Sequence, residues 1–436
     1  MSLVKQYNFE SKYMHFLWYF LFVMIVMQMP FCNVNAFDSI DDQSNGHIFV
    51  KSIRRLGDVG YGVTNFCWSA DGKQILLDKK NSSQSYDVMI LDLEKLTAKC
   101  KDVLSPVSEK WDVMRMGEIY SSNSPVWRPD NKYLAFCGEL GSNWGYHSNS
   151  IAFWEDCELC LADAKLERFW VIKPDYHNDK KCTGITMPFF SPDGKWLVWT
   201  AFFNDPYSDY FFGNRRLAVG NIHFYKKEKA CLDSVRLLNF PGENDFIEFY
   251  GFSPDANLFY FSANLKRNKT SDFPWTGMDI FSLEYQKQGS EPIPLTDSPE
   301  VWDRYACVSS GGKKILWSSG KGFLQPMLTN KGVSWRKYLR TELWIMNSDG
   351  TDKKCLTEFN NSKSKEYLGG RCFVGRSAFA PNSKKIAVVV YTEGPKFKLE
   401  SNLYILELET GYLPYRGVVI PTSDVHKVAE KEQKKD

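Results

Sequence analysis

Residues 190–195, Phe-Ser-Pro-Asp-Gly-Lys, followed by the run Trp-Leu-Val-Trp at 196–199, decide the fold of this chain. Proline sets the backbone φ at the start of a tight turn, aspartate bonds its own downstream backbone, and glycine accepts a positive φ. The apolar and aromatic run that follows is typical of a β-strand. The stretch therefore predicts two antiparallel strands joined by a tight hairpin turn.

The same unit recurs five more times, at intervals of 56 to 71 residues. The other copies are WSADGK at 68–73, WRPDNK at 127–132, FSPDAN at 252–257, VSSGGK at 308–313 and FAPNSK at 379–384. Most units continue with an alternating strand, such as 342–347, and a short fourth strand, such as 354–357. Repeats of four short strands without helical periodicity are typical of propeller blades. We therefore expect an all-β protein, a six-bladed β-propeller of four-stranded antiparallel blades.

A strand before the first repeat is expected to close the ring. Residues 47–56 read as an outermost strand and precede the first turn motif. A ring removes its exposed sheet edges only if the first and last blades share strands. We expect this N-terminal strand to join the sixth blade near residues 403–408.

The repeat resembles the WD40-like (PD40) repeat of the TolB-like β-propellers and of the propeller domains of prolyl-oligopeptidase relatives. The Ser-Pro-Asp-Gly-Lys turn and the strand pair LWIMNSDGTDKKCLT at 343–357 carry the resemblance. It extends over essentially the whole chain after residue 36 and implies the same ring architecture. TolB has an additional N-terminal α/β domain, for which residues 37–46 leave no room, so its role is not transferred.

The N-terminal segment resembles an export signal. Lys5 and Lys12 precede an apolar run at 16–29, and Val34-Asn35-Ala36 forms a small-x-small cleavage site. The run is shorter than a comfortable bilayer span. We expect a signal peptide at 1–36 that is cleaved after Ala36, with an uncleaved anchor as the alternative, and hence a periplasmic or secreted protein. Residues 37–422 would form one propeller, and the charged tail 423–436 would be disordered.

Charge and cysteine content restrict the function classes. Lys and Arg number 54 against 52 Asp and Glu, without a basic stripe, so nucleic acid is not an expected partner. Of the eleven cysteines, ten remain after residue 36; an exported protein could pair them, but the pairing cannot be read from the sequence. Cys157 and Cys160 have a metal-like spacing, yet residues three apart on a strand face opposite ways. We expect no metal, no haem and no other cofactor.

Long connections are expected at one face of the ring and short turns at the other. Loops on a rigid ring commonly carry recognition, and Trp, Tyr and Arg are frequent interface anchors. The candidate binding residues of the loop face are Trp111, Trp144, Tyr146, His147, Tyr207, Asp209, Tyr210, Trp275, Trp302, Arg304, Trp335 and Tyr338. The residues expected to build the turns are Asp71, Gly72, Asp130, Pro192, Asp193, Gly194, Asp255 and Pro381. The alternative is that the loop aromatics plug the ring itself.

Catalytic signatures are missing from the sequence. There is no Gly-x-Ser-x-Gly elbow, no His-Glu-x-x-His and no phosphate-binding loop, so no catalytic residue is assigned. We expect a non-catalytic propeller that binds or scaffolds a protein partner through the loop face, as a subunit of an extracytoplasmic complex. That complex could be a redox or metalloenzyme assembly whose partner carries the cofactor. A membrane would be contacted only through an uncleaved N-terminal segment. The alternative is a propeller-fold hydrolase or lyase that acts on glycans or peptides.

Overall fold

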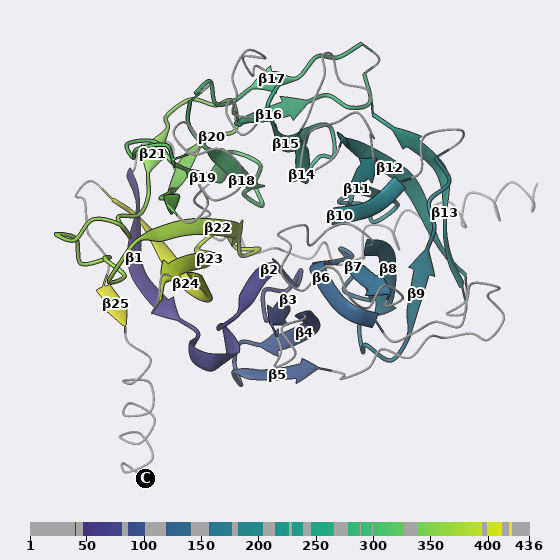
Figure 1. Ribbon diagram of the computed structural model, residues 1–436, viewed down its shortest axis with the longest axis horizontal. Helices are drawn as coiled ribbons and strands as arrows, with labels where there is room; N and C mark the ends of the chain where they lie inside the picture. The colour runs from purple at the N-terminus through teal and green to yellow at the C-terminus, as the bar shows by residue number, and fades with distance from the viewer. Residues whose placement is uncertain are drawn as a thin grey trace, which may run out of the picture. The chain divides into compact units, whose positions relative to one another are not determined.

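Six antiparallel sheets stand around a common centre in the computed structural model of the chain (Figure 1). The structure describes residues 40, 47–80, 86–100, 119–140, 157–176, 182–203, 214–225, 229–238, 246–265, 278–287, 289–298, 300–326, 338–394, 399–411 and 418–420. The described residues contain no α-helix and one 3₁₀ turn, η2 (Gly57–Val59). The predicted six-bladed β-propeller is therefore confirmed.

Each blade contributes its strands in sequence order, from the centre outward. Blades 1 and 2 are β2 (Val63–Trp68), β3 (Gln74–Lys80), β4 (Tyr86–Asp92), β5 (Thr97–Cys100), and β6 (Ile119–Trp127), β7 (Tyr133–Leu140), β8 (Cys157–Asp163), β9 (Phe169–Ile172). Blades 3 and 4 are β10 (Cys182–Phe190), β11 (Trp196–Phe203), β12 (Asn214–Tyr225), β13 (Lys229–Leu237), and β14 (Ile247–Phe252), β15 (Phe259–Ala263), β16 (Asp279–Leu283), β17 (Ile293–Pro294). Blade 5 is β18 (Asp303–Val308), β19 (Lys314–Ser319), β20 (Glu342–Asn347) and β21 (Lys354–Cys355).

Blade 6 closes the ring with a strand from the other end of the chain. It contains β22 (Cys372–Phe379), β23 (Lys385–Glu393) and β24 (Leu399–Gly411), and then β1 (His47–Arg55). β1 pairs antiparallel with β24, from His47 opposite Gly411 to Arg55 opposite Tyr404, which is where the sequence placed it. A fifth strand, β25 (Val418–Ile420), adds parallel to β1 and was not predicted.

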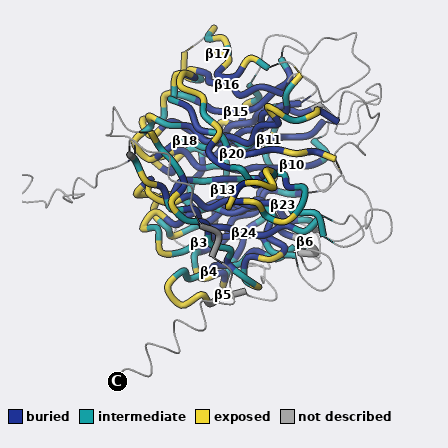
Figure 2. Tube along the Cα trace, turned by 90° about the vertical axis from the view of Figure 1, so that its left-hand side faces the viewer, coloured by how far each residue is buried: buried dark blue, intermediate teal, exposed yellow. Residues whose placement is uncertain are grey.

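One hydrophobic cluster fills each of the six interfaces between neighbouring blades. Figure 2 shows that the strands are buried along most of their length and that exposed residues concentrate in the connections. Cys157 packs in the cluster between blades 2 and 3, whereas Cys160 packs in the cluster between blades 1 and 2. The two thiols therefore lie on opposite faces of their strand, as the strand period requires.

The turn chemistry is the same in the repeats that keep serine and aspartate. Ser191 Oγ donates to Asp193 Oδ1 at 2.5 Å, and Asp193 Oδ1 accepts the backbone N–H of Lys195 at 3.0 Å. Ser69 with Asp71 and Ser253 with Asp255 repeat this arrangement. The fourth residue of each motif, at positions 71, 130, 193, 255, 311 and 382, is called the marker below. The residue after the marker has a positive φ in all six turns: Gly72, Asn131, Gly194, Ala256, Gly312 and Ser383. The turn therefore keeps a positive φ at this position even in the repeats that have another residue in place of glycine.

We expect Ala256→Gly to raise the free energy of unfolding by about 0.5–1 kcal/mol. Ala256 has a φ of +58°, a conformation in which a Cβ is strained and glycine is not. The gain is reduced by the greater freedom of glycine in the unfolded chain. Denaturant unfolding measures the change. Ala70→Gly, in the first repeat at an exposed turn position without a positive φ, is the matched control and should be neutral or destabilising.

Polar contacts between neighbouring turns join three of the six pairs of adjacent blades at one end of the ring. Ala70 N donates to Asn131 Oδ1 at 3.0 Å, and Arg128 Nε donates to the carbonyl of Gly194 at 3.1 Å. The hydroxyls of Ser310 and Ser383 lie 2.7 Å apart. These contacts join blades 1 to 2, 2 to 3 and 5 to 6.

A second set of polar links joins the middle of blades 1, 3 and 5 to the next blade. The residue seven positions after the marker lies in the second strand and is buried in every blade. Asp78 accepts the backbone N–H of Ser124 at 3.1 Å, and Ser318 donates to the carbonyl of Val374 at 2.7 Å. The partners lie in first strands, whose pairing shifts register in all six blades. A bulge frees backbone groups from the ladder, and the neighbouring blade supplies their partner.

Candidate functional site

The connections lie at two opposite ends of the ring. The first strand of every blade runs toward the motif turn, and the following strands alternate in direction. The motif turns and the third-to-fourth-strand turns therefore share one end, called the turn end below. The second-to-third-strand connections and the connections between blades share the other, called the loop end.

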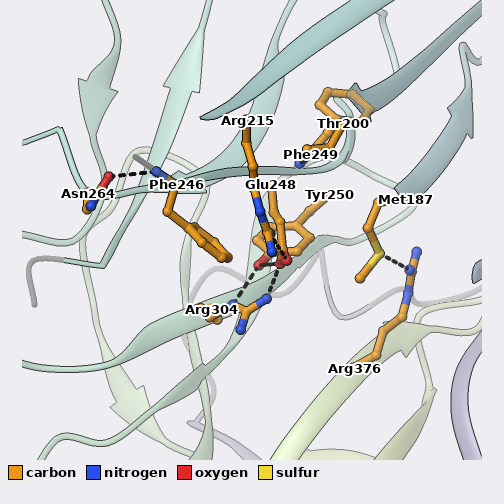
Figure 3. A network of polar contacts seen from close by, with 10 residues as sticks. All are labelled: Met187, Thr200, Arg215, Phe246, Glu248, Phe249, Tyr250, Asn264, Arg304 and Arg376. Atoms are coloured by element: carbon orange, nitrogen blue, oxygen red, sulfur yellow. Dashed lines mark hydrogen bonds and ion pairs between the residues drawn. The ribbon is translucent and has the colours of Figure 1, made fainter. Parts of the chain in front are cut away.

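A buried ion network lies at the loop end where blades 3, 4 and 5 meet (Figure 3). Glu248 in β14 accepts hydrogen bonds from Arg215 Nη1 at 2.7 Å and from the Tyr250 hydroxyl at 2.9 Å. Arg304 in β18 donates to the same carboxylate through Nη2. The side chains of Arg215 and Glu248 are 1% and 3% exposed. One carboxylate of blade 4 thus binds a guanidinium from each of its two neighbours.

Aromatic rings alternate with the two guanidinium groups. The Arg215 guanidinium carbon lies 4.7 Å from the ring centroid of Phe202 and 4.2 Å from that of Phe246. The Arg304 guanidinium carbon lies 4.9 Å from Phe246 and 5.0 Å from Trp302. Flat, weakly hydrated guanidinium groups stack well on rings, and such contacts strengthen when water is excluded. The stack extends the ion network across three blades.

The electrostatics of the network favour a fixed ion cluster. Burial by itself would raise the pKa of Glu248, but the charges of Arg304 and Arg215 outweigh it and hold that pKa below its usual value. Burial lowers the pKa of Arg215 to about 10, so this guanidinium stays charged at neutral pH. Both oxygens of Glu248 are engaged by donors. The carboxylate is therefore arranged to hold blades together and not to exchange protons with a substrate.

Two other buried acids hold connections at the loop end. Asp279, at the start of β16, accepts hydrogen bonds from the Thr296 hydroxyl at 2.8 Å and the Ser298 N–H at 2.9 Å. Glu342, at the start of β20, accepts the N–H groups of Phe359 at 2.9 Å and Asn360 at 2.8 Å. Each acid thereby fixes the connection that leaves its blade, so part of the loop end has a rigid base.

Asp303 is expected to make stability depend on pH near neutrality. Burial raises the pKa of Asp303 to about 7; hydrogen bonds from Ser319 and Trp317 oppose that shift, and the nearby Asp279 carboxylate adds to it. Because the folded pKa exceeds the unfolded value of about 3.9, this contribution is complete below pH 4 and is lost as the pH rises through 7. From pH 6 to pH 8 the free energy of unfolding should fall by about 1.4 kcal/mol through this group.

Asp303→Asn is the measurement that isolates this group. The amide can still accept the hydrogen bond that Trp317 Nε1 donates at 3.1 Å, but it does not titrate. Unfolding by denaturant at pH 6, 7 and 8 should show a smaller pH dependence in the variant than in the wild type. Equal slopes for the two proteins would contradict the assignment.

Three of the twelve candidate binding residues fall in the described part of the chain. Trp302 and Arg304 are buried, at 3% and 7% exposure, and belong to the stack and the ion network. Tyr338 is 59% exposed at the loop end. Outside the described residues lie the signal segment 1–36, the tail 423–436 and the other nine candidates: Trp111, Trp144, Tyr146, His147, Tyr207, Asp209, Tyr210, Trp275 and Trp335.

The eight residues expected to build the turns all lie in the motif turns. Asp130, in the second repeat, accepts the Lys132 N–H at 3.0 Å and is paired with Arg128 at 2.8 Å. Asp71, Gly72, Pro192, Asp193, Gly194, Asp255 and Pro381 occupy the corresponding turns of the other repeats. These residues therefore lie at the turn end, away from the loop end.

Exposed large hydrophobic side chains gather in the loop-end connections of consecutive blades. Leu324 and Tyr338 lie between β19 and β20, Tyr367 lies between β21 and β22, and Tyr61 lies between β1 and β2. They are 82%, 59%, 37% and 43% exposed, respectively. Of the exposed large hydrophobics in the described residues, only Leu96 and Ile293 lie elsewhere. The loop end of blades 5, 6 and 1 thus offers apolar contact points.

In the described residues, neither metal-ligating side chains nor cysteines form a further candidate site. Within the described ranges, no group of three His, Cys, Asp or Glu side chains could hold a metal ion. Nine cysteines in those ranges carry free thiols, Cys157 and Cys160 among them. No helix found in the same ranges is long and apolar enough to cross a membrane.

Sequence reasoning missed the residues that organise the centre of the ring. Arg215, Glu248 and Arg376 were not singled out because each lies within a strand (β12, β14 and β22, respectively) and not in one of the long loops that were searched for binding residues. The available signal was a charged residue inside an otherwise apolar strand, as in IEFYGF at 247–252 and CFVGRSAF at 372–379. Buried charges are rare unless they are paired, so such a position indicates a specific role.

The architecture defines the chain as a six-bladed β-propeller, in which a buried arginine network joins blades 3, 4 and 5. No protein-family model and no curated protein sequence matches it. The ring is instead similar to solved structures with other sequences.

Three similar structures illustrate the range. TolB from Acinetobacter baumannii is 16% identical, with 81% of this chain and 66% of that chain covered and a TM-score of 0.40. Oligogalacturonate lyase from Vibrio parahaemolyticus is 14% identical, with 83% and 96% covered and a TM-score of 0.42. Acylaminoacyl peptidase from Pyrococcus horikoshii is 14% identical, with 83% and 46% covered and a TM-score of 0.42. Similarity this distant carries no conclusion about activity.

Proposed function

We propose that this chain is an exported, non-catalytic propeller that presents its loop end to a protein partner in an extracytoplasmic complex. The observation that carries the proposal is the exposure of four large apolar or aromatic side chains, Tyr61, Leu324, Tyr338 and Tyr367, in the loop-end connections of blades 5, 6 and 1. Exposed apolar side chains that cluster on one part of a surface mark interaction sites, and tyrosine is enriched among interface anchors. Export rests on the signal-like segment at 1–36.

The rigidity of the ring supports this role. Asp279 and Glu342 hold the connections next to blade 5, and the Arg215–Glu248–Arg304 network ties three blades together. A surface that is ordered before binding loses less conformational entropy on docking. Both oxygens of Glu248 are engaged within this network, so this carboxylate is suited to structural support and not to proton transfer.

Site-specific photo-crosslinking tests the proposal. A benzophenone amino acid is placed at position 338 or 324 at the loop end, and at position 96 as the control, in cells that make the protein naturally. Leu96 is also an exposed hydrophobic residue, but it lies in the β4–β5 turn at the turn end. We expect a discrete protein adduct from 338 and 324 and none from 96. No adduct, or equal adducts from all three positions, would contradict the proposal.

A further inference from the structure

Arg376 reaches across the centre of the ring. It lies in β22, the innermost strand of blade 6, and its Nη1 is 3.2 Å from the Met187 Sδ in β10 of blade 3. In a ring of six blades numbered in order, blades 3 and 6 stand opposite each other. Figure 3 shows the Arg376 side chain directed toward Met187, on the far side of Tyr250 from the Arg304 network.

The contacts of Arg376 leave its charge largely uncompensated. A thioether sulfur is a weak acceptor, and the other contact is the ring of Phe189, at 4.7 Å from the guanidinium carbon. No ion pair joins Arg376 to any carboxylate of the described residues. Asp78 acts on it from a distance, but its carboxylate already accepts five hydrogen bonds from Thr64, Asn65 and Ser124.

The described groups closest to Arg376 are neutral. The thiols of Cys67 and Cys307 interact with it from the innermost strands of blades 1 and 5. Burial raises the pKa of Cys307 to about 11 and also raises the pKa of Cys67, so both thiols stay protonated at neutral pH. Nearby, Arg215 and Arg304 share the single carboxylate of Glu248. Among the described residues, positive charge therefore exceeds negative charge around Arg376, Arg215, Arg304 and Glu248.

Solvent reaches this part of the ring. Arg376, Tyr305, Cys67 and Cys307 are half-buried, although they belong to the innermost strands of a packed ring. The positions equivalent to Arg376 in blades 1, 2, 3 and 5, six residues before the marker, are neutral: Asn65, Ser124, Met187 and Tyr305. A cation without a counter-charge costs stability, so a purely structural strut would be better made of an apolar side chain.

We propose that Arg376 binds the oxyanion of a small ligand at the centre of the ring, an organic carboxylate or a phosphate monoester with an apolar or aromatic body. The planar guanidinium supplies a fork of N–H donors for the oxyanion. The rings of Phe189, Tyr250 and Tyr305 suit the apolar body. This site is independent of protein docking at the loop end, because it lies on the innermost strands.

Calorimetric titration of the full chain tests the site. The probes are phenylacetate for a carboxylate, phenyl phosphate for a phosphate monoester, and 2-phenylethanol as the neutral body alone. We expect the wild type to bind at least one anion and to bind 2-phenylethanol more weakly. Arg376→Met should weaken anion binding by about tenfold to a hundredfold, the range for losing charge-assisted hydrogen bonds, and Arg376→Lys should fall between.

Arg216→Met is the matched control. Arg216 also lies near a ring, at 5.6 Å from Phe203, but it belongs to β12, the third strand of its blade. Its replacement should leave anion affinity unchanged.

Without anion, Arg376→Met should melt at the wild-type temperature or above it, because an uncompensated charge is removed. The proposal is overturned if neither anion binds at 10 mM, which is on the order of the weakest useful affinity. It is also overturned if Arg376→Met binds the anions as the wild type does, or if that variant loses stability while it keeps its affinity.

Discussion

Replacing Glu248 by glutamine is expected to lower the free energy of unfolding by about 3–5 kcal/mol, the cost of leaving buried charges unpaired. Arg215 and Arg304 both bind this carboxylate, and all three side chains are less than a tenth exposed. Without the negative charge, two guanidinium groups would face each other in a site that water cannot reach. Chemical denaturation, followed by tryptophan fluorescence, measures the loss.

A triple variant separates this electrostatic cost from simple loss of packing. Arg215→Met, Glu248→Leu and Arg304→Met together remove every charge of the network and keep most of its volume. Replacing a whole buried ion cluster by apolar residues is often neutral or stabilising. The triple variant should therefore recover most of the stability that Glu248→Gln loses. If Glu248→Gln costs less than about 1 kcal/mol, the network does not hold the blades in the way described.

Replacing Asp78 by alanine is expected to cost about 3–5 kcal/mol as well. Its carboxylate accepts the N–H and hydroxyl of Thr64, the N–H and side-chain amide of Asn65, and the N–H of Ser124 from the next blade. Alanine would leave these buried donors without a partner, and each such group costs about 1–3 kcal/mol unless water reaches it. Loss of the Ser124 contact also removes a link between blades 1 and 2. Thermal and denaturant unfolding of the purified variant check the result.

The fourth blade offers a matched control for Asp78. Ser262 occupies the equivalent position in β15 and is fully buried, but its hydroxyl has no hydrogen-bond partner. Ser262→Ala should therefore be neutral or stabilising, by up to about 1 kcal/mol, because a buried unsatisfied hydroxyl is removed. If the two substitutions at this position cost the same, burial and not hydrogen bonding would explain the effect at Asp78.

These expectations share one structural basis. The hydrophobic clusters between blades supply most of the contact, but polar links select which residues of neighbouring blades meet. Asp78 with Ser124, Thr200 with Phe249 and Ser318 with Val374 repeat the same link around the ring. The Glu248 network adds to these links a contact that joins blades 3, 4 and 5 through one carboxylate. Because the repeat itself does not require this network, its residues are free to differ from those at the equivalent positions of the other blades.

The sequence predicts at which end of the ring the long connections lie, but it does not predict which of their side chains are exposed. The alternation of strands places every long connection at one end, and Tyr338 lies there, exposed. Arg304 was selected as a binding residue because it follows a predicted inter-blade connection, but its side chain is buried against Glu248. The partner of an arginine depends on residues that are 56 positions away in the sequence, and no local pattern identifies them.

The sequence by itself determined the local chemistry: the turns, the strands that they join, the number of blades and the strand that closes the ring. These follow from φ preferences, side-chain alternation and a repeat of about sixty residues, all of which act over short stretches of chain. Only the tertiary structure decided what lies at the centre. Closing the ring brings the first strands of opposite blades together, so Arg376 meets Met187 across 189 positions of sequence. Partial burial there makes an unpaired charge consequential, because less water screens it than at the surface.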